Sequence, residues 1–279
     1  MNVQLKREIA DEVIKMSQST SQNKVSAKAG VSSATISQIR NNNWELIADE
    51  MWRKIMSNLK ISTGWKIAPT TNLKSVTQLI AAAQQRKLSI GIAYDAGAGK
   101  SVCYKLYANE NPNSIYIECK NYWSKKSYVK SLLKACGIKP FGTTEEMIEH
   151  FLDHMKSLHD PILIIDQFDK LKDPSMDLFM DFYNELEGAC AFIVSGVPAL
   201  KKRVVKGAQR DKIGYRELYS RIGRKFIELD PIKLNDVKSI CEANGLTDKE
   251  EINYIFKNSE GDIRRVRRDV ERYHLLNQA

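Results

Sequence analysis

The spacing of apolar residues changes along the chain, and the change comes near residue 70. Over the first sixty residues the apolar positions recur at intervals of three or four, which is the period of a helix with one buried face. The first of these faces consists of Leu5, Ile9, Val13 and Met16. Farther along, short β-branched runs take turns with helical stretches, a pattern that predicts a parallel sheet. We therefore expect an all-α unit followed by an α/β unit.

The α/β part of the chain contains five runs with the length and composition of strands. They occupy residues 88–93, 115–119, 161–166, 192–195 and 226–229. Three helical stretches follow Pro231 and predict a small helical lid. The pattern divides the chain into an N-terminal helical domain at 1–61, a linker at 62–71, an α/β core at 72–230 and the lid at 231–279.

A loop with the composition of a phosphate-binding site follows the first predicted strand. It reads Asp95, Ala96, Gly97, Ala98, Gly99, Lys100 and Ser101. Backbone N–H groups at the start of the next helix can hold phosphates, Lys100 can reach the β- and γ-phosphates of ATP, and the Ser101 hydroxyl can bind Mg²⁺. The full pattern has a glycine where this chain has Tyr94, so the detailed shape of the loop is left open. We expect ATP and Mg²⁺ as cofactors.

The third predicted strand supplies the partner of this loop. It ends in Asp166, which we expect to hold Mg²⁺ through water, together with Ser101. Hydrolytic sites of this class usually place a glutamate after the aspartate, whereas this chain has Gln167. An amide can position water but cannot accept its proton, and a general base contributes about 10²–10⁴ in rate. Gln167 therefore predicts slow hydrolysis unless Asp169, one helical turn later, acts as the base, and the sequence leaves both readings open.

The N-terminal domain carries the pattern of a helix-turn-helix. Gly30 permits the turn, Ser32 caps the second helix, and Ile36 faces inward. The short polar side chains expected to be exposed near the start of that helix are Ser33, Thr35, Ser37 and Gln38. Such side chains suit a helix that lies in the major groove of DNA. A purely structural pair of helices is the alternative.

Composition and charge favour polyanionic partners. Of 279 residues, 43 are basic and 34 acidic, which gives a net charge of +9. The five cysteines are scattered and form no Cys-x-x-Cys pair, as in a cytoplasmic protein with reduced thiols. No apolar run approaches the length that spans a membrane. His150 and His154 have the spacing of a metal pair but no third ligand nearby in the sequence, so we expect a helix surface there.

With these motifs in this order, the chain resembles the AAA+ ATPases. The succession of helix-turn-helix, linker, ATPase core and lid is similar to the transposition ATPases that include the phage Mu B protein, IstB and TnsC. From the segments 218–222 (Leu-Tyr-Ser-Arg-Ile) and 261–264 (Gly-Asp-Ile-Arg), the resemblance implies an arginine finger at Arg221 and a sensor-2 contact at Arg264. It also implies sensor-1 at Ser195 and places Thr71 beside the nucleotide base. An arginine finger acts on a neighbour's γ-phosphate, which implies a homo-oligomer or helical filament.

Two further segments are candidates for contact with DNA. Cations interleaved with aromatic residues follow the second strand, and a basic run follows the fourth. The candidate residues are Lys120, Lys125, Lys126, Lys201, Lys202 and Arg203. In a filament such loops can follow the phosphate backbone, although a solvated charged surface has the same composition.

The resemblance implies an ATP-dependent, largely non-sequence-specific DNA-binding protein that oligomerises on double-stranded DNA and recruits or activates a transposase. Two other hypotheses remain open: a replication initiator or loader of the AAA+ type, and a transcription regulator gated by ATP. Sequence preference separates them, because a target-selection factor binds duplex DNA almost indifferently, whereas the other two need a specific site.

Overall fold

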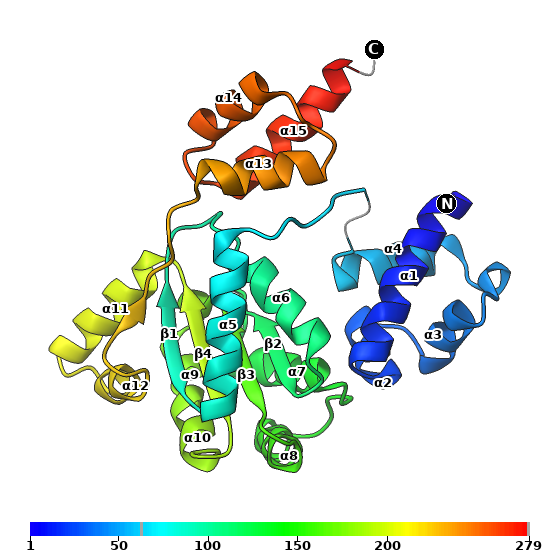
Figure 1. The fold of residues 1–279 in the computed structure, drawn as a ribbon. Coiled ribbons are helices and arrows are strands. Elements are labelled where there is room, and N and C mark those ends of the chain that lie inside the picture. Colours follow the sequence, from blue (N-terminus) through cyan, green and yellow to red (C-terminus); the bar gives the residue numbers. More distant parts are fainter. Residues whose placement is uncertain (62–63, 278–279) are drawn as a thin grey trace.

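A sheet of five parallel strands lies at the centre of the computed structural model, which describes residues 1–61 and 64–277 (Figure 1). The strands are β1 Ser89–Ala93, β2 Ser114–Glu118, β3 Ile162–Asp166, β4 Ala191–Gly196 and β5 Phe226–Ile227. Their order is β2-β3-β4-β1-β5, and every neighbouring pair runs in parallel. The predicted α/β fold with a parallel sheet is confirmed, although β5 is only two residues long.

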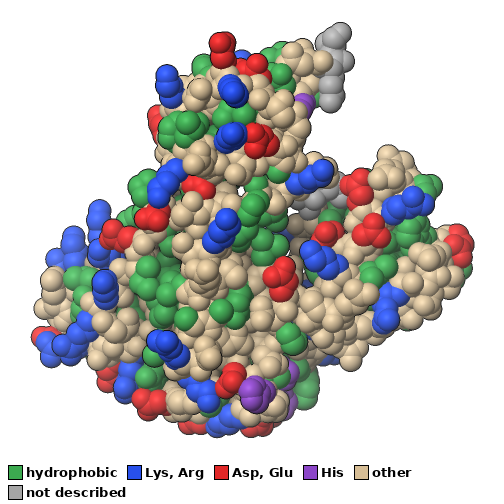
Figure 2. Space-filling model, viewed as in Figure 1, with side chains coloured by type: hydrophobic (Ala, Val, Ile, Leu, Met, Phe, Trp, Pro, Cys, Tyr) green, Lys and Arg blue, Asp and Glu red, His purple; other side chains and the backbone are tan. Residues whose placement is uncertain are grey.

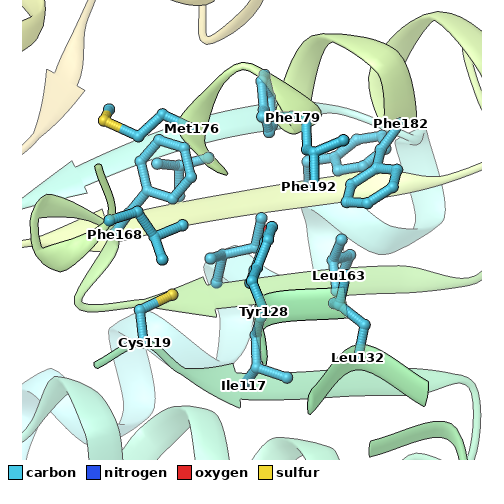
Figure 3. Close-up of a cluster of buried hydrophobic side chains, with 14 of the residues drawn as sticks. Ile117, Cys119, Tyr128, Leu132, Leu163, Phe168, Met176, Phe179, Phe182 and Phe192 are labelled. Atoms are coloured by element: carbon cyan, nitrogen blue, oxygen red, sulfur yellow. The ribbon is translucent and has the colours of Figure 1, made fainter. Parts of the chain in front are cut away.

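Helices cover both faces of the sheet, and alternate residues of each strand point into two separate cores. On β4, Phe192 and Val194 belong to the larger core, whereas Ile193 belongs to the smaller one. Figure 3 shows aromatic side chains of the larger core: Tyr128, Phe168, Phe179, Phe182 and Phe192. The helices of the larger core are α7 Lys125–Cys136, α8 Thr144–Ser157, α9 Asp173–Met176, α10 Leu178–Glu185, α11 Pro198–Gln209 and α12 Tyr215–Arg221. Those of the smaller core are α5 Thr71–Arg86 and α6 Lys100–Glu110.

Residues 1–61 form a helical unit with its own core. Its elements are α1 Val3–Ser19, α2 Gln22–Ala29, α3 Ser33–Arg40, the 3-10 turn η1 Trp44–Leu46 and α4 Asp49–Leu59. Ile9, Ile36 and Trp52 are fully buried in it. The turn between α2 and α3 depends on Gly30, whose φ of 68° lies in the left-handed region, and Ser32 caps α3. A DNA-binding role for this pair of helices stays a prediction.

The N-terminal unit packs against the α/β core mainly through α2, which contacts α7, and also through α1, which contacts α6. Lys24 crosses this interface, where its ammonium group donates to the carbonyl oxygens of Pro112 at 2.9 Å and Ser114 at 3.0 Å. Burial, with a smaller contribution from Lys28, lowers the pKa of Lys24 to about 8. A Cβ on Gly137, at the end of α7, would lie 2.9 Å from the Lys24 Cα, so the two backbones meet closely here.

The last unit is a helical lid beyond the carboxyl edge of the sheet (Figure 1). Its helices are α13 Leu234–Ala243, α14 Lys249–Ser259 and α15 Ile263–Asn277. Val237, Ile255 and Val266 are fully buried between them. Of the predicted linker 62–71, residues 62 and 63 lie outside the described residues, and Thr71 already begins α5. In the described parts of the chain, no helix is long and apolar enough to cross a membrane.

The aromatic cluster predicts where the α/β core is most sensitive to truncation. Phe192 is fully buried beside Phe179, with ring centroids 5.5 Å apart. Phe192→Ala should lower the free energy of unfolding by about 3–5 kcal/mol, because lost burial adds to the cavity left behind. Phe141→Ala, at a phenylalanine that is 63 % exposed, is the control and should change it by less than about 1 kcal/mol. Urea denaturation measures both, and equal losses would contradict this packing.

Candidate nucleotide-binding site

The predicted phosphate loop lies between β1 and α6 and depends on two glycines. Gly97 and Gly99 have φ angles of 89° and 90°, in the left-handed region that favours glycine. Gly99 is also the N-cap of α6, so the free N–H groups of that helix begin at the loop, as phosphate binding requires. Tyr94, which replaces the first glycine of the pattern, donates its N–H to the Gly196 carbonyl at 3.3 Å. The replaced glycine thus falls at the end of the strand, before the turn itself.

Lys100 is the cation of this loop and is only 8 % exposed. Its ammonium group donates to the carbonyl oxygens of Tyr94 at 2.6 Å and Asp95 at 2.7 Å. Burial lowers the pKa of Lys100, and the carboxylates of Asp166 and Asp95 oppose that effect. Neutral carbonyl groups compensate a buried ammonium charge only in part, whereas phosphate oxygens carry the full opposite charge. The loop therefore fits the phosphates of a nucleotide.

The structure brings Ser101 and Asp166 together. Ser101 Oγ donates to Asp166 Oδ2 at 2.5 Å, and Asp166 is 1 % exposed at the end of β3. Burial raises the pKa of Asp166, while hydrogen bonds from Ser101 and from the Gln167 N–H lower it. A hydroxyl beside a desolvated carboxylate suits Mg²⁺, which binds through one or two protein oxygens together with water and phosphates. The described residues contain no cluster of three or more acidic, His or Cys side chains that could hold a metal ion.

A comparison with protein families agrees with this geometry. Residues 84–204 match the family model of the AAA domain. This segment is an AAA-type ATPase domain. The match spans β1 to β4, with the phosphate loop and Asp166, and ends before Arg221 and the lid. No curated protein matches the chain.

Gln167 is held in the AAA domain by both ends of its amide. Its Nε2 donates to Glu118 Oε1 at 3.1 Å, and its Oε1 accepts from the Lys170 ammonium group. Slow hydrolysis stays a prediction, because an amide cannot take up a proton but another carboxylate can. Glu118 is the residue that sequence interpretation missed. It lies opposite Asp166 in the register of the sheet, and its one signal was its place at the carboxyl end of a parallel strand.

Asp169 is the carboxylate that the sequence offered as a substitute base, and it lies in the 3-10 turn η2 Phe168–Lys170, just after β3. Among the residues that the structure describes, its buried Oδ1 has no hydrogen-bond partner. A Cβ on Gly196 would lie 2.4 Å from this oxygen, so the carboxylate packs against the end of β4. A role for Asp169 as the base stays a prediction.

Ser195 is not brought to the surface of the phosphate loop. It is fully buried, and its hydroxyl shares a hydrogen bond of 2.9 Å with the Tyr104 hydroxyl of α6. The cause is strand alternation, because Ser195 follows Ala191 and Ile193 on the face of β4 that packs under α6. The structure therefore does not support the expected sensor-1 contact of this side chain with the nucleotide.

The lid contributes Arg264 and touches the phosphate loop directly. The Ile263 N–H, at the start of α15, donates to the Gly97 carbonyl at 3.0 Å. A Cβ on Gly99 would lie 3.3 Å from Cδ1 of Ile263, the residue before Arg264, so the start of α15 lies against the loop. Thr71 also lies where the core meets the lid, since its N–H donates to Asp236 of α13 at 2.6 Å. A contact with the nucleotide stays a prediction for both Arg264 and Thr71.

Arg221, the expected arginine finger, ends α12 and lies beside residues that precede β4, away from its own phosphate loop. Its guanidinium group lies 4.8 Å from the centroid of the Tyr183 ring and 3.7 Å from the Glu187 carboxylate. Its side chain is 41 % exposed and is thus accessible to a neighbouring molecule. A role in an adjacent subunit stays a prediction.

Two of the residues expected to face DNA from α3 are engaged inside the N-terminal unit. Thr35 is 8 % exposed and shares a hydrogen bond of 2.9 Å with Ser32, which corrects the expectation that it is exposed. The reason is the helix cap, because Ser32 draws both the N–H and the hydroxyl of Thr35 toward itself. Ser33 accepts a hydrogen bond of 3.0 Å from Gln22. The half-buried candidates are Ser37 and Gln38.

Arg203 forms its hydrogen bonds and its ion pair within the AAA domain. Its guanidinium group donates to the carbonyl oxygens of Asp169 at 3.0 Å and Leu171 at 2.8 Å, and pairs with Asp173 at 2.5 Å. With Tyr215, these partners engage all three of its nitrogen atoms. Most of its donors are thus used within the domain, and a contact of Arg203 with DNA stays a prediction.

The other basic candidates differ in whether they pair with a carboxylate. Exposed cations at the start of α7 and on α11 are Lys125, Lys126 and Lys202. Lys120 pairs with Glu118 at 3.2 Å, and Lys201 pairs with Glu228 at 2.7 Å. Figure 2 shows basic side chains gathered over α11 and α12, at the left edge of the molecule. Contact with DNA stays a prediction for all of them.

The geometry predicts that nucleotide binding depends on Lys100. Lys100→Ala removes the ammonium group from the loop, and charge-assisted hydrogen bonds of this kind contribute about 1.5–3 kcal/mol each, so affinity for ATP should fall at least about tenfold. Titration with a fluorescent ATP analogue measures the loss. Lys130→Ala, at an exposed lysine of α7, is the control and should bind as the unmodified protein does. Unchanged affinity in Lys100→Ala would contradict the assignment of the loop.

Proposed function

We propose that this protein is an ATP-dependent, largely non-sequence-specific DNA-binding AAA+ protein that oligomerises on double-stranded DNA and recruits or activates a transposase. The observation that carries the proposal is the combination of units. A phosphate loop paired with Asp166 lies in one domain, and a helical unit with a tight turn between α2 and α3 packs directly against that domain.

The DNA-binding part of the proposal is supported by charge and by the orientation of the N-terminal unit. α1 and α2 pack against the AAA domain, whereas α3 lies on the far side of the unit (Figure 1). The net charge is +9, and exposed cations such as Lys126 and Lys202 are available to phosphates. A protein that binds mainly through phosphate contacts tolerates many sequences.

Oligomerisation is supported by Arg221. This exposed arginine lies away from its own phosphate loop, and a guanidinium group is suited to stabilise the charge of a γ-phosphate held by another subunit. ATP would then lie between subunits, so that assembly and nucleotide state are coupled.

The role in transposition rests on the order of the units, which is similar to that of transposition ATPases. A replication initiator or loader is the second candidate, and an ATP-gated transcription regulator is the third. Electron microscopy of the protein on random-sequence duplex DNA with ATP, and then with ADP, tests the proposal. Continuous assemblies on DNA that form with ATP but not with ADP support it. Binding confined to one DNA sequence favours the other two candidates.

DNA affinity should depend on ATP and fall steeply with salt. Each phosphate neutralised by a cation releases condensed counterions, so the logarithm of affinity should fall linearly with the logarithm of salt concentration, by about 0.9 per contact. Fluorescence anisotropy with random and fixed duplexes at several salt concentrations measures this slope. A salt-insensitive preference for a single duplex would contradict the proposal.

Arg221 should matter for assembly and not for nucleotide binding by the isolated subunit. Arg221→Ala should retain affinity for the ATP analogue, yet lose long assemblies on DNA, because only the contact with the neighbour is removed. Arg216→Ala, at an exposed arginine of the same helix, is the matched control. Normal assemblies formed by Arg221→Ala would make Arg221 an ordinary surface charge.

A further inference from the structure

Glu118 supplies a carboxylate next to Gln167, the residue that stands where the pattern expects the catalytic glutamate. It ends β2, opposite Asp166 at the end of β3. Its Oε1 accepts the hydrogen bond from Gln167, the residue that stands in place of that glutamate, at 3.1 Å. A carboxylate is therefore present within one side chain's reach of the expected catalytic position, on the neighbouring strand.

Three ammonium groups surround this carboxylate. Lys105 lies 3.5 Å and Lys120 3.2 Å from it, and Lys60 makes the shortest ion pair. Burial raises the pKa of Glu118, but the cations, with Lys60 first among them, hold it down to about 2. In this arrangement the carboxylate is ionised and is held by the three ammonium groups and the Gln167 amide.

Lys60 comes from a different unit than the other two cations. It is the C-cap of α4, at the end of the N-terminal unit, whereas Lys105 and Lys120 belong to the AAA domain. The Lys60 side chain is 50 % exposed, so the pair lies at the edge of the interface and can open without exposing a core. The contact links the helices expected to bind DNA to the residues beside Asp166.

We propose that Glu118 is the catalytic carboxylate for ATP hydrolysis, and that Lys60 holds it in an inactive ion pair while the N-terminal unit is docked. The proposal rests on the ATP-dependent DNA binding proposed above, and it adds ATP hydrolysis to that function. Gln167 acts as a positioning residue, since its amide aligns the Glu118 carboxylate from the strand beside it. Movement of the N-terminal unit on DNA would break the pair with Lys60, the shortest of the three, and leave only the longer pairs with Lys105 and Lys120.

The chemical step is balanced within ATP, water and Glu118. The oxygen of water forms a bond to the γ-phosphorus, and the bond from that phosphorus to the β–γ bridging oxygen breaks. ADP leaves with the electron pair of the broken bond, and Glu118 accepts a proton of the water, which it later returns to solvent. Asp169 is the rival for this role, because its Oδ1 has no hydrogen-bond partner in the described chain.

Four variants of the full chain separate these assignments. Glu118→Gln should lower DNA-stimulated turnover by about 10²–10⁴, the usual contribution of a general base, and should lower turnover without DNA by a smaller factor. Its affinity for the ATP analogue should be unchanged. Lys60→Gln should raise turnover without DNA by roughly 5- to 150-fold, the common range of coupling between sites, and abolish further stimulation by DNA. Lys54→Gln, at an exposed lysine of α4, is the matched control and should behave as the unmodified protein. Asp169→Asn should retain turnover.

Two measurements do not depend on turnover. ADP with fluoroaluminate, which mimics the phosphoryl group in flight, should be trapped by the unmodified protein and by Lys60→Gln, but not by Glu118→Gln. Hydrogen exchange of the backbone at the end of α4 should increase in Lys60→Gln and Glu118→Gln alike, without nucleotide, because both remove the same contact.

Several results would overturn the inference. They are normal turnover in Glu118→Gln, loss of turnover in Asp169→Asn alone, and a Lys60→Gln variant that is no faster than Lys54→Gln. Unaltered exchange at the end of α4 in both variants would remove Lys60 from the mechanism. Failure of the proposed function is distinguishable, because the unmodified protein would then form no ATP-dependent assemblies on random-sequence DNA, whereas the exchange at the end of α4 is measured without DNA or nucleotide.

Discussion

Two buried charges at the carboxyl edge of the sheet constrain the rest of the structure. Lys100 is 8 % exposed and Asp166 is 1 % exposed. Each charge has lost most of its hydration, and only strong dipoles or opposite charges can compensate for that loss. The loop glycines, the start of α6 and the Ser101 hydroxyl are arranged around these two groups. A buried ion that is incompletely paired costs several kcal/mol, so phosphate and a cation stabilise the folded domain when they bind.

The other two units reach the same edge through polar contacts. The lid donates the Ile263 N–H to the Gly97 carbonyl, and the N-terminal unit places Lys60 on Glu118. A partly exposed ion pair contributes about 0–1 kcal/mol to stability, so the pair of Lys60 with Glu118 can exchange partners without unfolding either unit. Lys24 differs, because its buried ammonium group is held by two carbonyl oxygens. The interface thus combines a firm anchor with an exchangeable contact.

Features that depend on local pattern could be predicted from the sequence. The strands, the loop ending in Lys100 and the carboxylate of Asp166 each follow from a short run of residues, and the structure brings them together. Thr35 and Arg203 could not be judged in this way, because a cap and a set of carbonyl partners decide their exposure. Glu118 belongs to no local motif. Its place beside Asp166 exists only once β2 lies next to β3.

Linkage makes the contact between the N-terminal unit and the AAA domain reciprocal. If a ligand favours the state in which Lys60 has left Glu118, then a second ligand that favours the same state binds more tightly in its presence, by the same factor. Lys60 lies at the boundary of one unit and Glu118 beside Asp166 of the other, so the pair joins the two binding regions through only two side chains. In the proposed mechanism the element that changes state is the ion pair itself, so that coupling between DNA and nucleotide needs no long chain of packed residues.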